Sequence, residues 1–220
     1  MRAMPVKRIA GAIVALLVLV AVAWAIIYFT PVMTVKNVVA DGNQHVSDED
    51  IASATGVEPG IPLAQVNTRE AASGVASVPW VKSATASRSW PSTLKIKVEE
   101  NVAVAFMKGP QGATLIDAEG REFAVDTPPD NAVELTGGMN DENVRKDAVD
   151  IVASLSDKAK GAVDSIEARS KYDFVLHLKD KTVVWGASED NENKSLALDT
   201  VLQREGGEFN VSNPQQITSK

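Results

Sequence analysis

The first thirty residues combine a basic start with a long apolar run. No charged side chain occurs between Ile9 and Phe29, and three basic residues stand just before this run. About 21 residues at roughly 1.5 Å each form a helix of roughly 31 Å, close to the thickness of a bilayer's hydrocarbon core. We therefore predict a transmembrane helix over residues 9–30, preceded by a short cytoplasmic tail at residues 1–8.

The charges around this run predict its orientation. Basic residues near one end of a span hold that end in the cytoplasm, and no acidic residue precedes Asp41. The bulk of the chain is thus expected outside the cytoplasm, anchored to the cell membrane. The alternative is a cleaved secretory signal, with Ala21 and Ala23 in a small-residue cleavage pattern. Such signals have apolar cores of about 7 to 15 residues, so we favour a retained anchor.

Residues 32–101 show the order strand, helix, helix, strand, strand. Ser47 and Asn67 are the expected N-caps of the two helices, because each is followed three residues later by a carboxylate. In the last strand, apolar residues alternate with charged ones, the period of a half-buried strand. This order predicts one compact α+β unit. The strands are expected at 32–40, 80–89 and 93–104.

Residues 102–220 contain short extended runs separated by turn dipeptides, together with two stretches of helical periodicity. We predict a mainly antiparallel β domain with flanking helices on one side. The strands are expected at 104–107, 113–116, 122–125, 132–135, 163–168, 172–178 and 182–185, the helices at 141–155 and 193–203, and a short final extended segment around Phe209 and Val211.

Composition restricts what the exported part can bind. All 29 acidic residues and all but three of the 22 basic ones lie beyond position 30, so this part carries a charge of about −10. A nucleic-acid groove or a patch for anionic lipid would need the opposite sign. The chain has no cysteine, so the exported part must be stable without disulfides.

Candidate chemistry is sparse. His45 and His177 fall in different predicted units, and no serine lies in a Gly-x-Ser-x-Gly motif. Ser154 and Ser156 near two lysines could suggest a serine–lysine hydrolase, but no further catalytic group accompanies them. The acidic runs lack the pattern of a calcium loop. We therefore expect no enzyme activity, no cofactor and no bound metal.

Other features have plain structural interpretations. Asn193 and Asn210 begin patterns that match glycosylation acceptors, but patterns of three residues recur by chance, and we interpret both as accidental. The tryptophans Trp80, Trp90 and Trp185 are expected to pack in or around a core, although an exposed aromatic residue could also anchor a partner.

Several motifs in a fixed order carry a family resemblance. They include Val78-Pro79-Trp80-Val81, the run from Trp90-Pro91-Ser92 through Thr93-Leu94-Lys95-Ile96-Lys97-Val98, and the closing Asn210-Val211-Ser212-Asn213-Pro214. With these motifs the chain resembles the bacterial division family FtsQ, also called DivIB. One departure is Glu100-Asn101-Val102-Ala103, where family members often have Glu-Arg-x-Pro.

The resemblance implies a POTRA domain after a single transmembrane helix, and a scaffold at the division septum. Similar proteins hold the bitopic division proteins FtsB and FtsL and help to regulate the septal peptidoglycan synthase; FtsK-like proteins are further candidate partners. A POTRA-bearing factor for polypeptide transport is the alternative from another class. Such factors usually carry several POTRA units and a barrel.

A physical mechanism for partner binding fits the carboxyl end. A short last strand leaves unpaired N–H and C=O groups at a sheet edge, and an incoming peptide can satisfy them by adding a strand. We expect this edge, together with a neighbouring helix face, to bind the partner. The candidate partner-binding residues are Phe209, Asn210, Val211, Ser212, Asn213, Pro214, Lys194, Leu198 and Leu202.

Overall fold

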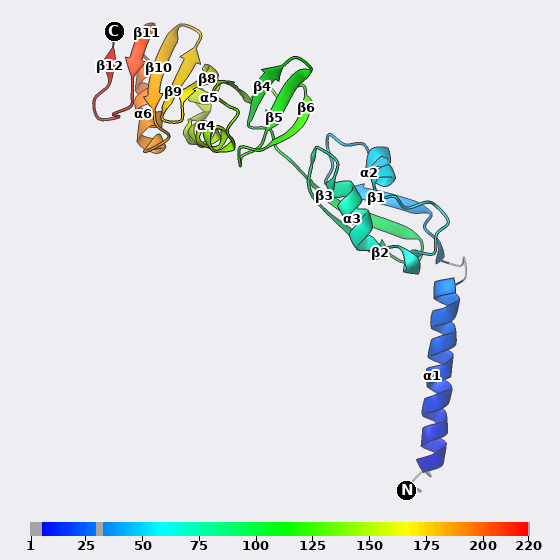
Figure 1. Cartoon of the computed structure of the whole chain (residues 1–220). Coiled ribbons are helices and arrows are strands. Elements are labelled where there is room, and N and C mark those ends of the chain that lie inside the picture. The colour runs from blue at the N-terminus through cyan, green and yellow to red at the C-terminus, as the bar shows by residue number, and fades with distance from the viewer. Residues whose placement is uncertain (1–5, 30–32, 220) are drawn as a thin grey trace. The chain divides into compact units, whose positions relative to one another are not determined.

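The computed structural model describes residues 6–29 and 33–219 (Figure 1). These residues form two compact units, Met1–Glu100 and Asn101–Lys220. Most of the predicted cytoplasmic tail (residues 1–5) and the last residue of the predicted span (residue 30) lie outside the described residues. Helix α1 (Val6–Phe29) opens the first unit. Among the described residues, no helix proved long and apolar enough to cross a membrane.

The remainder of the first unit follows the predicted order of strand, helix, helix, strand, strand. Both predicted caps are confirmed, because Ser47 Oγ accepts the N–H of Asp50 at 3.1 Å and Asn67 Oδ1 accepts that of Glu70 at 3.3 Å. Its elements are β1 (Asn37–Asp41), α2 (Asp48–Ala54), the 3-10 helix η2 (Leu63–Gln65), α3 (Thr68–Ala76), β2 (Val81–Ser89) and β3 (Thr93–Glu100).

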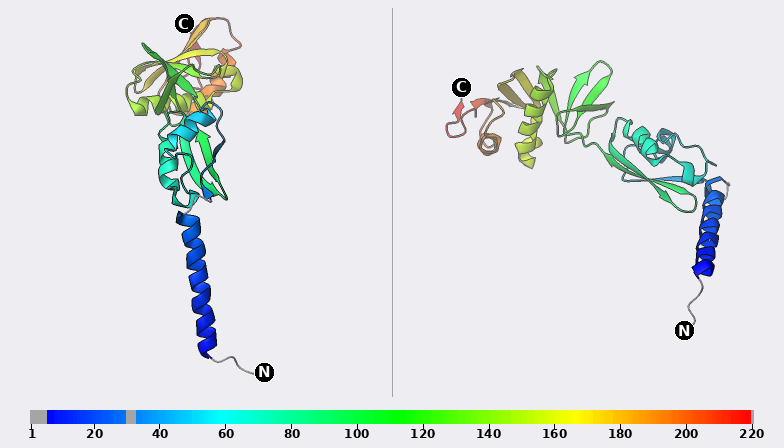
Figure 2. Two further views of the ribbon diagram at one scale, coloured as in Figure 1. Left: turned by 90° about the vertical axis from the view of Figure 1, so that its right-hand side faces the viewer. Right: turned by 60° about the horizontal axis from the view of Figure 1, so that its bottom comes forward.

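Strand β3 lies in the centre of a three-stranded sheet, parallel to β1 and antiparallel to β2. Leu94, Ile96 and Val98 on β3 are buried, while the charged residues between them are exposed or half-buried, so the predicted alternation is confirmed. Helices α2 and α3 cover the apolar face of the sheet (Figures 1 and 2). A single hydrophobic core therefore holds the part of this unit after α1 together.

The second unit contains strands and helices in a mixed order. Its elements are β4 (Ala105–Gly109), β5 (Gly112–Ile116), β6 (Glu122–Asp126), β7 (Val133–Gly137), α4 (Glu142–Ser154), α5 (Asp157–Lys160), β8 (Val163–Ser170), β9 (Asp173–Leu178), β10 (Lys181–Gly186), α6 (Asn191–Val201), β11 (Gly207–Asn210) and β12 (Thr218–Ser219).

All strands of the second unit join one nine-stranded sheet in the order β12-β11-β10-β9-β8-β7-β4-β5-β6. Five neighbouring pairs are antiparallel and three are parallel, so the sheet is mainly antiparallel, as predicted. Helices α4 and α6 lie side by side against one face (Figure 1). Trp185, Phe174 and Ile151 are fully buried in the core between them and the sheet.

Some local predictions were wrong. The strand expected at 93–104 ends at Glu100, because the chain passes there into the second unit and pairs in the other sheet. The sequence did not reveal α5, whose four residues are too few to show a helical period. Trp185 is buried as expected, whereas Trp90 is 51% exposed and belongs to neither hydrophobic core.

Candidate partner-binding edge

One end of the nine-stranded sheet is built from the last residues of the chain. Strand β11 pairs in parallel with β10, and β12 pairs antiparallel with β11 through Phe209 opposite Ser219 and Asn210 opposite Thr218. Both residues of β12 are exposed. In the described part of the chain no strand lies outside β12, so its outer side is an open sheet edge.

The prediction that Phe209–Pro214 forms this edge is wrong. Strand β11 lies inside the sheet, between β10 and β12. Phe209 is 5% exposed and Val211 is fully buried, because residues of this alternation point into the core. The backbone N–H of Val211 also donates to the carbonyl oxygen of Val184 at 2.9 Å. The side chains of these two residues therefore pack in the core and stabilise the sheet.

The segment between β11 and β12 is a turn ordered by two asparagines. Asn210 Oδ1 accepts the N–H of Ser212 at 2.9 Å, and Asn213 Oδ1 accepts that of Gln215 at 3.2 Å. These are Asx turns, in which a side chain replaces a backbone acceptor. Ser212 and Asn213 are exposed, whereas Pro214 is half-buried. The Asn-Val-Ser-Asn-Pro motif thus folds the chain back so that β12 can form.

The predicted helix face on α6 lies against the core. Leu198 is fully buried, Leu202 is half-buried, and Lys194 is only 4% exposed. Lys194 Nζ donates to the carbonyl oxygen of Ala187 at 2.8 Å and so holds the loop between β10 and α6. Burial lowers the pKa of Lys194, and the nearby carboxylate of Glu189 partly opposes this shift. The proposal that Lys194 and Leu198 contact a partner is therefore not supported by their positions.

The accessible side of α6 faces a groove next to the sheet edge. Leu196 is 66% exposed, although it is a large apolar residue. The groove has a volume of about 360 Å³ and runs between α6 and the segment that leads into β12. Its lining residues are Asp190, Asn193, Leu196, Ala197, Thr200, Pro214, Gln215 and Ile217. We call this groove together with β12 the carboxyl-terminal edge.

Sequence reasoning missed the residues that this edge presents. Thr218 and Ser219 form a strand too short to show a period of two. Leu196 did carry a signal, because it lies outside the stripe of Lys194, Ala197, Leu198 and Val201 that the helical spacing places on one face. An exposed leucine off the core stripe is a simple indication of a contact surface, although single exposed apolar residues are also common.

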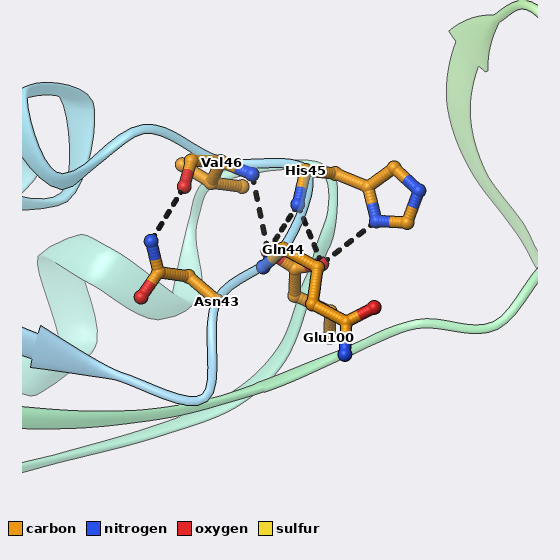
Figure 3. Close-up of polar contacts among 5 residues, drawn as sticks. All are labelled: Asn43, Gln44, His45, Val46 and Glu100. Atoms are coloured by element: carbon orange, nitrogen blue, oxygen red, sulfur yellow. Dashed lines mark hydrogen bonds and ion pairs between the residues drawn. The ribbon is translucent and has the colours of Figure 1, made fainter.

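A polar cluster closes the far end of β3 in the first unit (Figure 3). The side chain of Glu100 is 8% exposed. Its carboxylate accepts the backbone N–H groups of Gln44 at 2.9 Å, His45 at 3.0 Å and Val46 at 3.1 Å, and lies 2.8 Å from His45 Nδ1. Burial alone would raise the pKa of Glu100, but these hydrogen bonds outweigh it, and the pKa is lowered.

His45 also stacks on Trp80, with ring centroids 4.0 Å apart and planes 5° from parallel. His177, in the other unit, lies 3.0 Å from Glu167 through its Nε2 atom. Each histidine thus has a carboxylate neighbour within its own unit. In the residues that the structure describes, no group of three or more histidine or acidic side chains is placed to hold a metal ion.

The order of elements and the first core define a protein with a POTRA domain of the β-α-α-β-β type, followed by a larger α+β unit with a nine-stranded sheet. The family model for the FtsQ-type POTRA domain matches residues 33–101. Whole-chain similarity extends this match beyond the domain, and the chain belongs to the FtsQ family of cell division proteins.

The relatives show how far the similarity reaches. The chain is 32% identical over 218 residues to the cell division protein FtsQ of Corynebacterium glutamicum, covering 96% of this chain and 98% of that protein. It is 35% identical to FtsQ of Mycobacteroides abscessus, covering 94% and 68%. It is also 35% identical to FtsQ of Mycolicibacterium smegmatis, covering 89% and 60%. A role in cell division follows from this membership.

Proposed function

We propose that this chain is a membrane-anchored scaffold of the division machinery, without enzyme activity of its own. In this proposal residues 1–8 lie in the cytoplasm, residues 9–30 cross the cell membrane, and the POTRA domain (32–101) and β domain (102–220) lie outside the cytoplasm. The exported part binds bitopic proteins similar to FtsB and FtsL at the division septum. FtsK-like proteins and the septal peptidoglycan synthase complex are the further partners.

The observation that carries the proposal is the open side of β12. Edge strands offer unpaired backbone groups, and natural proteins usually protect them. Here the edge is short and its two residues are polar, so it resists random pairing, yet a groove with an exposed leucine lies beside it. A partner that adds a strand to β12 could place an apolar side chain in this groove. Backbone hydrogen bonds to β12 would then provide affinity, and the groove would provide selectivity between partners.

The anchor is supported by the exposed face of α1. Nine large apolar side chains between Ile13 and Trp24 are each at least 51% exposed. Soluble monomers rarely expose a contiguous apolar patch larger than about 300–600 Å², so such a surface favours contact with lipid. The uncharged run from Ile9 to Phe29, with basic residues before it, supports the same orientation. Anchoring would keep the exported units at high effective concentration beside tethered partners.

Proline substitution at the edge tests the partner-binding site. Val211 would be a poor position for this test, because it is buried and its replacement would unfold the sheet. The substitution is proline at Thr218 or at Ser219, at the position whose backbone N–H points away from β11. We expect this variant, as the full chain in nanodiscs, to lose its ability to capture the extracytoplasmic part of an FtsB-like partner. The folded state, followed by circular dichroism, should persist.

The matched control is Val125→Pro on β6, the strand at the opposite edge of the same sheet. This variant should bind the partner as the unaltered chain does. Native affinity in both β12 variants would show that the carboxyl-terminal edge is not the binding site. The alternative of a polypeptide-transport factor has no observation of its own in its favour, since the family match is to a division protein.

A further inference from the structure

Trp90 is an exposed aromatic residue at the tip of the β2–β3 hairpin, and the division scaffold proposed above does not use it. Its side chain is 51% exposed, whereas Trp80 stacks on His45 and Trp185 is fully buried. The hairpin turns directly after Trp90, with Ser89 opposite Thr93 as the last pair of the ladder. An indole at the tip of a hairpin in this way gains little stabilisation from contacts with the protein core.

The tip lies at the end of the sheet where the chain enters the POTRA domain. The carbonyl oxygen of Ser92 accepts the N–H of Lys36 at 2.8 Å, just before β1 begins. Helix α1 ends at Phe29, seven residues before Lys36. Because an extended chain spans at most about 3.6 Å per residue, Lys36 lies within about 25 Å of Phe29 whatever path the chain takes. The hairpin tip is therefore tethered close to the end of the proposed anchor.

Charge is distributed unevenly along this domain. Arg88 donates to the carbonyl oxygens of Leu63 and Val66, so the start of α3 lies at the same end as the hairpin tip. Exposed cations at this end outnumber the carboxylates, and carboxylates dominate the opposite end. The tip end has Lys36, Arg69 and Lys95 with Glu58 and Glu70, and Lys95 Nζ lies 3.9 Å from Asp41 Oδ2. The opposite end has Asp48, Glu49, Asp50 and Glu99 with Lys82, while Asp41 and Lys97 face each other between the two ends.

We propose that this tip docks on the anionic lipid surface of the membrane, with the Trp90 indole in the headgroup layer and Lys36 facing lipid phosphates. Tryptophan is enriched at membrane–water interfaces, and each cation near an anionic surface contributes about 1 kcal/mol. The acidic end of the domain points away from the same surface, which avoids repulsion. The proposal rests on the anchor proposed above, because the tether brings the tip to the membrane.

The docked tip would fix how the POTRA domain stands on the membrane. With only the tether, the rotation of the domain relative to the membrane would not be fixed. A second contact at Trp90 restricts that rotation and holds β3, which leads into the second unit, in a narrower range of directions. The lipid surface would thus contribute to the orientation of the POTRA domain.

A single spin label can test this contact, because the chain has no cysteine. Ser89→Cys places the label beside Trp90 at an exposed position. The full chain is reconstituted in phosphatidylcholine vesicles with and without phosphatidylglycerol, and collisions with oxygen and with a water-soluble nickel chelate are measured. Glu49→Cys, at the opposite end of the domain, and Leu16→Cys, in α1, are the matched controls.

With phosphatidylglycerol present, the Ser89 label should collide with oxygen more, and with nickel less, than the Glu49 label. Trp90→Ser should remove this difference. Lys36→Gln should lower the ratio of docked to undocked tip about fivefold, the factor that corresponds to about 1 kcal/mol. Leaving out phosphatidylglycerol should also lower the ratio of docked to undocked tip.

The controls separate the two proposals. If the Leu16 label lies in lipid but the Ser89 label is as accessible to nickel as the Glu49 label, the docking proposal is wrong and the anchor stands. If the Leu16 label is itself water-accessible, both are overturned. Shielding of the Ser89 label that requires an added division protein, and not lipid, would show that the tip is a protein interface and would refute the lipid assignment.

Discussion

Replacing Glu100 with alanine should destabilise the POTRA domain more than any other change of an acidic residue in it. The carboxylate accepts three backbone N–H groups and contacts His45 Nδ1. Hydrogen bonds to a charged group contribute about 1.5–3 kcal/mol each when buried and less when water can replace the partner. Gln44 and His45 are exposed, so their amides can bind water; the amide of the buried Val46 cannot do so easily. We therefore expect a total loss of about 3 kcal/mol.

A loss of this size is measurable. For a domain of this length, about 3 kcal/mol lowers Tm by roughly 12–24 °C. Thermal unfolding of the full chain, followed by fluorescence of Trp80, reports on this unit because Trp80 stacks on His45. Hydrogen exchange of the amides of residues 44–46 gives a local readout, and these amides should lose protection in Glu100→Ala.

Two variants control for the charge and for the position. Glu99→Ala removes the neighbouring carboxylate, which is exposed and accepts a hydrogen bond from Ser83 Oγ, and should change stability by less than about 0.5 kcal/mol. Glu100→Gln keeps one acceptor oxygen and should fall between the wild type and alanine. A loss below about 1 kcal/mol in Glu100→Ala, with unchanged exchange at residues 44–46, would refute the role assigned to the carboxylate.

Three further predictions concern pH and packing. Folding lowers the pKa of Glu100. The carboxylate's contribution to stability is therefore complete above pH 4.5, the ordinary pKa of the group, and is lost as the pH falls through the lowered pKa. Urea midpoints should decline less steeply below pH 4.5 in Glu100→Gln than in the unaltered chain, and parallel curves would contradict this. Leu198→Ala should lower the free energy of unfolding in urea by about 2–5 kcal/mol. Leu196→Ala should change this free energy by less than about 0.5 kcal/mol and should weaken partner capture. Equal losses of stability would show that the two helix faces were misassigned. The carboxylate of Asp117, a residue that is 3% exposed, accepts the N–H groups of Glu119 and Arg121 at 2.9 Å. Asp117→Ala should therefore lower the free energy of unfolding by about 2–3 kcal/mol, and Asp117→Asn should lower it by less.

Local signals in the sequence predicted the first unit well. Ser47 and Asn67 are caps whose partners lie three residues away, and the alternation in β3 is visible within eight residues. Both signals depend only on neighbours along the chain. The position of β3 between β1 and β2 depends instead on contacts across more than 50 residues, and no local pattern expresses them.

The candidate site was predicted only in outline. The carboxyl end of the chain does form a sheet edge, but the sequence favoured the apolar Phe209 and Val211, which are apolar because they are buried. Lys194 was expected on the surface, where a lysine in a polar stretch usually lies, but it is buried. Here its ammonium group binds the carbonyl oxygen of Ala187, a requirement of the loop that periodicity does not reveal.

The pairing of β1 with β3 has a mechanical consequence. The chain enters the POTRA domain at the start of β1 and leaves it at the end of β3, and these two strands are parallel neighbours from Asn37 opposite Thr93 to Asp41 opposite Lys97. A force that pulls the two ends apart would slide the strands along each other. The ladder's hydrogen bonds would then bear the load together, and would not break one after another as in an unzipped hairpin. The domain is thus arranged to resist tension along the path from its entry to its exit.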